Sequence, residues 1–373
     1  MKILLVSPGI PPDKTGGIEN HVQMLSSQLR ERGHSVSILT RYHKLDLDDN
    51  DIVQIKRPAG EFYGYGTWAV KAWLKSWGLD HDLVHFHGFD GQILSLTPFL
   101  SSRKIVHVHN SLTMEPERYK RDVIRHRIGY FLASESFRRA KVVMAPTETV
   151  KQDILHHIKD INPEKIRIVP NFIDPERFSR NGTGEDVRRK YSLEEKFVIL
   201  YFGKIKRTKG IEDLCKAFRI LKKKIDAALI IGGAPTATNR YFNYLSSTYT
   251  DVIFTGYVPD SRPYYAAANA FAIYTPGFEG GEVFPIALLE AMSMGLPVVC
   301  SDSPIFREVT KGNAIFSMPQ NPEALAESLY LLSKDPEKAS EIGKKNREMA
   351  ETSYNVRNVG GTIEEIYKEV YKS

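Results

Sequence analysis

The chain contains the stretch Glu282-Val-Phe-Pro-Ile-Ala-Leu-Leu-Glu290, which continues as Ala-Met-Ser-Met-Gly-Leu-Pro-Val-Val299. Pro285 suits the first turn of a helix, because its missing N–H has no helical partner to lose there. Apolar residues at helical spacing predict a helix from about 285 to 294, and Gly295-Leu-Pro297 predicts its end. The next residues, Val298-Val-Cys300, are expected to form a buried strand. This stretch therefore predicts a loop, a helix and a strand of a parallel sheet.

Two carboxylates lie on either side of the predicted helix start. Glu282 belongs to the loop, and Glu290 lies a little over one turn inside the helix. Gly280 and Gly281 would let backbone N–H groups approach an anion, and the helix N-terminus adds the positive end of its dipole. The glutamate pair alone would also fit a solvated loop residue and a helix residue satisfied by a neighbouring cation. With the glycines, the stretch indicates a site for a phosphate.

Two further glycine-containing loops also follow predicted strands and are candidates for phosphate binding. Gly16 and Gly17 follow a predicted strand at 2–7 and open a predicted helix that ends at Gly33. This order is typical of a phosphate-binding loop, although a glycine pair also permits a plain tight turn. The segment Gly203-Lys-Ile-Lys-Arg-Thr-Lys-Gly210 follows a predicted strand at 197–202. Its place after a strand, with glycine at both ends, favours phosphate binding over an ordinary solvated loop.

Together these segments resemble the retaining nucleotide-sugar glycosyltransferases of glycosyltransferase family 4, also called glycosyl transferases group 1. The glutamate pair with the following Glu-Ala-Met-x-x-Gly-x-Pro-Val-Val is similar to the donor-site signature of that family. The other segments that match are the Gly16-Gly17 loop, Arg32-Gly-His-Ser-Val36, Val169-Pro-Asn-Phe-Ile-Asp-Pro-Glu-Arg-Phe178, the Gly203–Gly210 loop and Phe254-Thr-Gly-Tyr-Val258. Lys204 replaces an arginine of the family, and a lysine offers a point charge in place of a bidentate fork.

The resemblance implies an α/β protein with the GT-B fold, in which two doubly wound Rossmann-like domains face a cleft and a C-terminal helix crosses back to the N-terminal domain. Short apolar strands alternating with helical segments independently favour parallel sheets. Strands are expected at about 2–7, 35–40, 51–55, 83–87, 104–109, 141–145, 166–169, 197–202, 227–231, 252–255, 269–274, 297–300 and 314–316. The polar run at 180–185 predicts the boundary. It gives an acceptor-side domain of residues 1–180 plus 354–373 and a nucleotide-sugar-binding domain of residues 185–353.

The resemblance further implies transfer of a sugar from a UDP- or GDP-sugar to a carbohydrate or lipid-linked acceptor, with retention at the anomeric carbon and without a metal ion. Glu282 would orient the sugar hydroxyls, and Glu290 would accept the ribose hydroxyls. Lys204, Lys209 and the amides at Gly280 and Gly281 would stabilise the diphosphate leaving group. The other donor contacts that it implies are Gly16, Gly17, Tyr257, Val258, Val283 and Phe284. No cofactor other than the donor substrate is expected.

Four histidines end two predicted strands: His85 and His87 in one, His107 and His109 in the other. Each pair puts two imidazoles on one face of a strand, which is a spacing that metal ligands also use. No Asp or Glu between them completes a ligand set, so a polar lining of the ligand crevice is the preferred interpretation and no metal site is expected. The resemblance places His109 near the transferred sugar, as a catalytic candidate with Glu282 and Lys209. A histidine satisfied within the core is the alternative.

The sequence says less about the acceptor site than about the donor site. His87, His109 and Arg125 are its candidate residues. From Glu117 to Lys141 there are eight Lys or Arg against three Asp or Glu, with apolar residues on one helical side. This predicts either a helix on an anionic bilayer, which suits a lipid-linked acceptor, or a core-facing helix with a solvated basic face. The aromatic segment from Phe62 to Trp77 either shapes an acceptor pocket or packs in the core.

Composition limits the remaining choices. The 373 residues exceed what one core usually supports, and 42% hydrophobic with 26% charged residues indicate a soluble globular protein. A net charge of +6 favours an anionic surface as partner, whereas no nucleic-acid-binding module is visible. Without a membrane span or secretory signal, a cytoplasmic location is expected, peripheral to the membrane if the basic region binds it. Cys215 and Cys300 are expected to be buried thiols, with no disulfide framework.

The expected biological role is the synthesis of cell-envelope polysaccharide or glycolipid. Two other functions share the fold, namely a GT-B epimerase and a catalytically silent sugar-nucleotide-binding protein or membrane scaffold. The epimerase lacks the Glu282-to-Glu290 signature with its apolar continuation. The silent protein would not need the full set of Glu282, Glu290, Lys209 and the Gly16-Gly17 loop. The sequence therefore favours the transferase.

Overall fold

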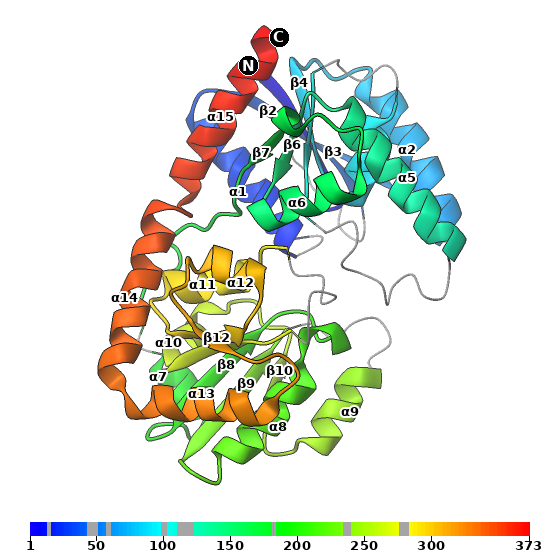
Figure 1. Ribbon diagram of the computed structural model, residues 1–373. Coiled ribbons are helices and arrows are strands. Elements are labelled where there is room, and N and C mark those ends of the chain that lie inside the picture. The colour runs from blue at the N-terminus through cyan, green and yellow to red at the C-terminus, as the bar shows by residue number, and fades with distance from the viewer. Residues whose placement is uncertain are drawn as a thin grey trace. The chain divides into compact units, whose positions relative to one another are not determined.

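The computed structural model describes residues 1–12, 16–42, 51–56, 61–97, 103–109, 123–180, 182, 184–233, 240–275 and 283–373. The chain divides into two compact units (Figure 1). The first unit comprises Met1–Phe172 and Val356–Ser373, and the second comprises Ile173–Asn355. One chain segment therefore enters the second unit and another returns to the first.

The division falls at Phe172, before the polar run at 180–185 where the sequence predicted the boundary. The backbone N–H of Ile173 donates to the Tyr354 carbonyl at 2.8 Å. The Arg347 guanidinium donates to the carbonyls of Pro175 and Phe178 at 3.0 and 2.7 Å. These contacts attach residues 173–178 to the second unit.

The first unit contains a parallel sheet of seven strands in the order β3-β2-β1-β4-β5-β6-β7. The strands are β1 (Lys2–Ser7), β2 (Ser35–Tyr42), β3 (Ile52–Lys56), β4 (Leu83–His87), β5 (Lys104–His107), β6 (Val142–Ala145) and β7 (Ile166–Ile168). Strand β1 pairs with both β2 and β4, so the strand order reverses there. In open α/β sheets, ligands bind beyond the carboxyl ends of the strands at such a reversal.

Helices cover this sheet. They are α1 (Gly17–Glu31), α2 (Glu61–Ser76), α3 (Gly88–Ser95), α5 (Val123–Arg139), α6 (Glu148–His157), the 3-10 helix η1 (Pro163–Lys165) and α15 (Val356–Lys372). Helix α15 lies beside α1 (Figure 1), and Ile363 and Tyr367 of α15 share a buried cluster with Val22 and Leu25 of α1. The predicted amphipathic terminal helix is confirmed, and it packs in the first unit.

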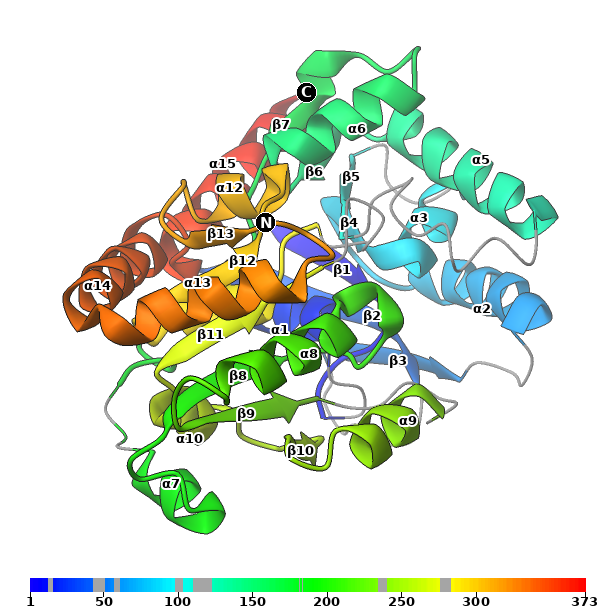
Figure 2. The same ribbon diagram turned by 60° about the horizontal axis from the view of Figure 1, so that its bottom comes forward.

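The second unit contains a parallel sheet of six strands in the order β10-β9-β8-β11-β12-β13 (Figure 2). The strands are β8 (Phe197–Phe202), β9 (Ala227–Gly232), β10 (Ile253–Gly256), β11 (Ala270–Ile273), β12 (Val298–Ser301) and β13 (Ile315–Ser317). The strands predicted in both units are confirmed to within two residues at each end. The interior strands, such as β4, β5, β9 and β11, are buried along their whole length, as strands covered on both faces of a parallel sheet are, whereas the strands β7, β10 and β13 are only partly buried.

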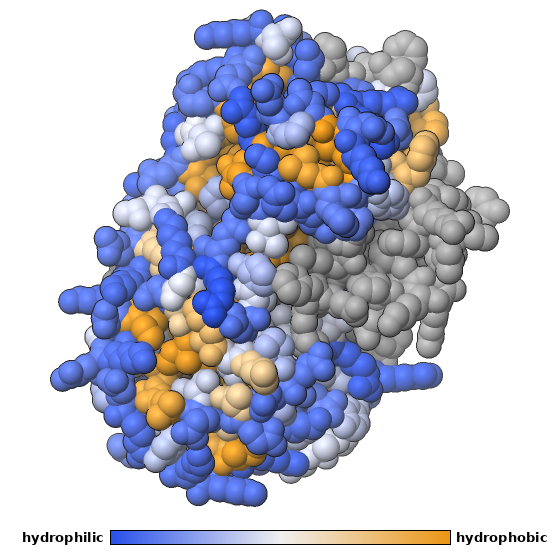
Figure 3. All heavy atoms as spheres, in the orientation of Figure 1, coloured by the Kyte–Doolittle hydropathy of each residue, from blue (hydrophilic) through white to orange (hydrophobic). Residues whose placement is uncertain are grey.

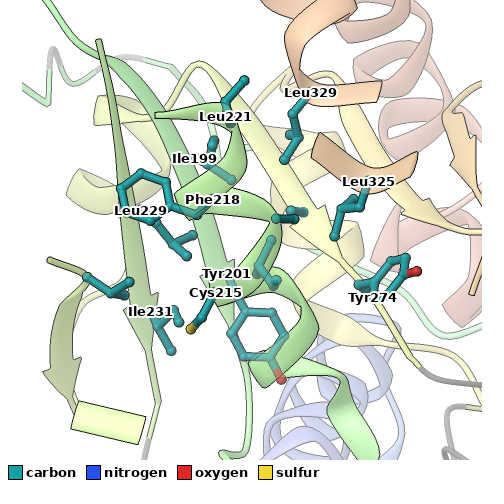
Figure 4. Close-up of a cluster of buried hydrophobic side chains, with 14 of the residues drawn as sticks. Ile199, Tyr201, Cys215, Phe218, Leu221, Leu229, Ile231, Tyr274, Leu325 and Leu329 are labelled. Atoms are coloured by element: carbon teal, nitrogen blue, oxygen red, sulfur yellow. The ribbon is translucent and has the colours of Figure 1, made fainter. Parts of the chain in front are cut away.

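Helices also cover the sheet of the second unit. They are α7 (Glu185–Tyr191), the 3-10 helix η2 (Arg207–Lys209), α8 (Ile211–Leu221), α9 (Arg240–Thr248), α10 (Arg262–Ala267), α11 (Ile286–Ser293), α12 (Pro304–Val309), α13 (Pro322–Lys334) and α14 (Pro336–Thr352). Figure 4 shows Phe218 of α8 close to Ile199 and Leu229 of the sheet, with Leu325 and Leu329 of α13 on the other side. These contacts fix α8 and α13 over the sheet.

The helix predicted at 285–294 is confirmed as α11. Pro285 is its N-cap residue, so the helix begins one residue later than expected. Gly295 has a positive φ of 66°, and the Leu296 N–H donates to the Ala291 carbonyl at 3.0 Å. This is the glycine-terminated helix end that the sequence predicted.

Both cysteines are fully buried and free, as expected. Burial raises the pKa of the Cys215 thiol to about 12 and raises that of Cys300 as well. No helix in the described part of the chain is both long enough and apolar enough to cross a bilayer. Hydrophilic residues cover most of the described surface seen in Figure 3, with apolar patches between them.

Candidate functional site

Glu290 is held in place by a tyrosine of a neighbouring helix. The Tyr265 hydroxyl of α10 donates to Glu290 Oε2 on α11 at 2.7 Å, and Tyr265 is fully buried. Burial raises the pKa of the Glu290 carboxyl to about 7, although the Tyr265 hydrogen bond and the charge of Arg177 oppose this shift. The residue as a whole is only partly buried. The site thus contains a carboxyl that changes charge near neutral pH.

The loop after β8 depends on glycine at two positions. Gly203 and Gly210 have φ values of 157° and 60°. A Cβ atom on Gly210 would lie 2.0 Å from the Tyr274 carbonyl oxygen, so only glycine fits at this position. Lys204 follows β8 as an exposed residue, and Lys209 is half-buried in η2 directly before α8. The two lysines predicted to bind phosphate therefore share one short loop at the carboxyl end of β8.

Arg207 in the same loop has other partners. Its guanidinium lies 4.7 Å from the ring centre of Tyr241 and 5.9 Å from that of Tyr244, both on α9. It also lies 3.9 Å from the Glu212 carboxylate. Cation–π contact and ion pairing tie this side of the loop to α8 and α9. Arg207 is therefore engaged within this loop and with the two neighbouring helices.

The other predicted donor contacts on the second unit differ in exposure. Tyr257 follows β10 and is 59% exposed, and Val258 next to it is half-buried. Val283 and Phe284 precede α11 and are buried, and the Phe284 ring packs edge-on against Tyr354 at 5.4 Å. A donor contact from Val283 or Phe284 would therefore come from the backbone. Gly280, Gly281 and Glu282 lie outside the described residues.

In the first unit, the structure brings the predicted histidines together. His87 ends β4, and it pairs in register with His107 at the end of β5. His87 Nδ1 and His109 Nε2 are 2.9 Å apart, and the rings of His107 and His109 stack at 4.6 Å. His85 Nδ1 lies 2.6 Å from the Tyr367 hydroxyl of α15. These side chains thus gather near the carboxyl ends of β4 and β5.

A fifth histidine, which the sequence analysis missed, completes the group. His21 of α1 packs against His107 and His109, with ring centres 4.7 and 4.8 Å apart. It lies on the same apolar stripe as Ile18 and Val22, and a polar residue on that stripe was the signal that could have identified it. Ligand atoms of His21, His87, His107 and His109 all lie within 4.8 Å of one another. We call these four residues the histidine cluster.

The histidine cluster is neutral. Burial lowers the pKa of His109 to about 3, and it lowers those of His21, His87 and His107 well below the usual histidine range. Both ring nitrogens of His107, and Nε2 of His87, are buried without a hydrogen-bond partner among the described residues, whereas His21 hydrogen-bonds to the Asn171 side chain. Buried polar atoms without partners are uncommon, because desolvation is then uncompensated.

The remaining predicted residues also lie in the first unit. Gly16 is the extended N-cap residue of α1, and Gly17 is the first residue of that helix. A Cβ atom on Gly16 would lie 2.5 Å from Glu19 Oε2, so a side chain there would displace the buried glutamate. Arg125 lies on α5, and its side chain is outside the described part of the structure.

The aromatic segment 62–77 covers α2 from its second residue to its end and Trp77 directly after it, and it has two faces. Trp68 and Ala72 are buried, whereas Val70, Leu74 and Trp77 are 54%, 56% and 62% exposed. Part of this segment is therefore core, and part is an exposed apolar stripe.

Comparisons with known proteins find similarity to glycosyltransferases in both units. The family described as Glycosyl transferases group 1 matches residues 184–349, and the one described as Glycosyltransferase Family 4 matches residues 15–177. An uncharacterized glycosyltransferase of Methanocaldococcus jannaschii is 25% identical over 87% of each chain. The alpha-galactosylglucosyldiacylglycerol synthase of Streptococcus pneumoniae is 26% identical over 63% of this chain and 64% of that protein. The Anabaena HepE structure with UDP and glucose has a TM-score of 0.80 at 18% identity, covering 99% of this chain and 100% of HepE.

Proposed function

Since the chain belongs to the GT-B glycosyltransferases of group 1 and family 4, we propose that it transfers a sugar from a nucleoside diphosphate to a carbohydrate or lipid-linked acceptor, with retention at the anomeric carbon. Most donor groups would lie on the second unit and the acceptor-side groups on the first. The observation that carries the proposal is the Glu290 carboxyl, fixed by Tyr265 on α11 and still partly exposed.

Glu290 would bind the ribose of the donor. Two vicinal hydroxyls can donate to the two oxygens of one carboxylate, and Tyr265 fixes the orientation of that carboxylate. Tyr257 and Val258, at the end of β10, would contact the base. HepE was solved with UDP, which supports a UDP-sugar as the first donor to test, with a GDP-sugar second.

Lys204 and Lys209 would bind the diphosphate. As the bond between the anomeric carbon and the diphosphate breaks, negative charge develops on the leaving oxygen. Two lysines on one loop can stabilise this charge without a metal ion at the diphosphate. The Gly280 and Gly281 amides would add to this stabilisation. Glu282 would orient the transferred sugar.

His87, His109 and Arg125 are the acceptor-side candidates. A general base works best when its pKa lies near the working pH, and the pKa of His109 is lowered to about 3. His109 is therefore better suited to hydrogen-bonding a sugar hydroxyl than to removing its proton. This assigns His109 a positioning role in transfer.

A lipid-linked acceptor is favoured by the exposed stripe of α2. Val70, Leu74 and Trp77 are exposed at helical spacing, and Lys71 and Lys75 beside them are exposed cations. Apolar residues flanked by lysines suit an anionic membrane surface. The glycolipid-synthase relative supports an acceptor of this class. In the basic segment 117–141, residues 117–122 lie outside the described residues.

The experiment is a thermal-shift series with UDP-, GDP- and ADP-sugars, because a ligand that binds only the folded state raises the melting temperature. One nucleotide is expected to raise it in the wild-type chain but much less in Glu290→Ala. Glu341→Ala is the matched control, because Glu341 is an exposed helix residue of the same unit that pairs with Lys345. Its shift should equal that of the wild type.

Two results would contradict the proposal. The first is the absence of a shift with every nucleotide sugar, which would favour a silent scaffold. The second is an equal shift in wild type and Glu290→Ala, which would remove Glu290 from the site. With the donor known, release of free nucleotide on addition of candidate acceptors then measures transfer, and nuclear magnetic resonance of the product determines the anomeric configuration.

A further inference from the structure

The transfer reaction leaves part of the histidine cluster without a role. His87 and His109 are acceptor-side candidates, but His21 and His107 have no place in donor or acceptor binding. Both are at most 1% exposed. The Asn171 side chain hydrogen-bonds to His21, whereas both ring nitrogens of His107 are buried without a hydrogen-bond partner among the described residues, so the burial of His107 carries an unexplained cost.

We propose that His21, His87, His107 and His109 form a binding site for a divalent transition-metal ion such as Zn²⁺. This inference does not rest on the transfer reaction. It also differs from the expectation, drawn from the sequence, that these histidines only line a crevice. In the sequence, the two histidine pairs did not make a complete set of metal ligands. In the structure, His21 of α1 completes the set.

The separation of the ligand atoms is close to what a metal requires. One nitrogen from each ring lies within 4.8 Å of all the others. Zn²⁺ is bound by imidazole at about 2.0–2.1 Å, so ligand nitrogens of a tetrahedral site are about 3.4 Å apart. His87 Nδ1 and His109 Nε2 are already 2.9 Å apart. Small rotations of the rings would therefore bring the four nitrogens to coordination distance.

The chemistry of the set selects the type of metal. Each neutral imidazole offers one unprotonated nitrogen as a ligand. Four nitrogen ligands without a carboxylate among them suit Zn²⁺, Cu²⁺, Ni²⁺ or Co²⁺ and do not suit Mg²⁺ or Ca²⁺, which prefer oxygen. The ion would satisfy buried nitrogens of His107 and His87 that have no partner among the described residues.

The surroundings of the cluster would support such a site. The ligands come from α1, β4, β5 and the residue pair after β5, so an ion would cross-link these elements. His85 packs against His87 with ring centres 4.1 Å apart, and the Tyr367 hydroxyl binds His85. Asn171 hydrogen-bonds to the ligand His21, and a partner of this kind fixes the orientation of a metal-binding imidazole. His109 is the most exposed of the four, so an ion would enter past it.

The test is a titration of the chelator-stripped full chain with Zn²⁺, followed by isothermal calorimetry, and with Co²⁺, followed by its visible absorption. We expect one ion per chain, an intense tetrahedral Co²⁺ band and a melting temperature that rises with Zn²⁺. His107→Phe keeps an aromatic ring in the buried position but removes the ligand. Because loss of an outer neighbour alone costs 10- to 100-fold in metal affinity, we expect this variant to bind at least about 100-fold more weakly.

Two controls keep the result interpretable. His156→Ala removes an exposed histidine of α6 outside the cluster and should bind Zn²⁺ like the wild type. His109→Ala changes the most exposed ligand, so it tests the site even if His107→Phe fails to fold. The proposal is overturned if the wild type binds no ion. It is also overturned if His109→Ala, or a folded His107→Phe, binds as tightly as the wild type.

Discussion

Glu290 shows how burial can outweigh a favourable hydrogen bond. The Tyr265 hydroxyl stabilises the ionised carboxylate, and Arg177 does the same through its charge, yet burial still raises the pKa to about 7. The folded protein therefore holds this proton at a pH where an ordinary glutamate has lost it. A diol that donates two hydrogen bonds would restore the missing solvation of the carboxylate.

This pKa predicts a pH-dependent stability. Between the ordinary value of 4.5 and the folded value of about 7, the folded state binds more protons than the unfolded state, so stability falls as pH rises. Glu290→Gln cannot ionise and should escape this loss. Allowing for the partial exposure of Glu290, we expect the variant to gain about 2 kcal/mol relative to wild type between pH 4.5 and pH 8. Urea unfolding at both pH values without nucleotide measures this gain; an equal difference at the two values would contradict the shifted pKa.

The same group predicts how donor affinity depends on pH. If the carboxylate binds the ribose, affinity should increase as pH rises through 7. With a pKa near 7, the ionised fraction rises about tenfold between pH 6 and pH 8, and the affinity for the nucleotide sugar should follow. Calorimetry on wild type and Glu290→Gln tests this. A parallel pH dependence in the variant would show that another group is responsible.

At the scale of elements, the junction of η2 and α8 is fixed by one glycine. Gly210 combines a φ of 60° with a Cβ position 2.0 Å from the Tyr274 carbonyl. Gly312 is a matched control, because its φ is 78° but nothing lies within 4 Å of its Cβ position. We expect Gly312→Ala to cost about 1 kcal/mol and Gly210→Ala about 3 kcal/mol or more, since only the latter adds a clash with the backbone.

Gly210→Ala should also weaken donor binding, because Lys209 directly precedes the displaced residue. Chemical denaturation gives the stabilities, and the thermal-shift assay with the selected nucleotide gives the binding. If the two substitutions lower the free energy of unfolding equally, the loop relaxes around the new side chain at residue 210. The close approach to Tyr274 would then not contribute to stability.

The exposed stripe of α2 makes a separate prediction. The double variant Leu74→Ser with Trp77→Ser should lower binding to vesicles with anionic lipid several-fold, because both apolar anchors are lost. Leu331→Ser is the matched control, since Leu331 is a 57% exposed leucine of the second unit. Co-sedimentation with vesicles measures the effect. If the wild type does not sediment with anionic vesicles, the α2 stripe is no membrane surface.

At the scale of the whole molecule, the first unit needs the end of the chain. Ile363 of α15 is fully buried in the cluster that also contains residues of α1 and β1. Ile363→Ala should cost about 2–5 kcal/mol, and the loss should fall on the first unit. Glu365→Ala, at a 68% exposed side chain on the same helix, should cost little. Hydrogen exchange should show faster exchange in β1 and β4 with β8 and β9 unchanged; equal loss in both sheets would contradict two separate cores.

The sequence was sufficient for the strands, because continuous Val, Ile and Leu runs bounded by polar residues leave few alternatives in a parallel sheet. It placed the boundary later than the division between the two compact units, because the attachment of residues 173–178 depends on Tyr354 and Arg347, which are far away in the chain. For the same reason, Tyr265 was missed as the partner of Glu290. The contacts that complete a site join distant segments, and no local pattern records them.

The two thiols are fully buried, one in α8 and one in β12, and burial raises the pKa of each. Thiol reagents attack the thiolate, so these natural cysteines should remain unreacted in the folded chain. A cysteine introduced at an exposed position would then be the sole site for a maleimide fluorophore. With one such dye on each unit, single-molecule energy transfer could follow the distance between the units during turnover, in a chain that keeps both of its own cysteines.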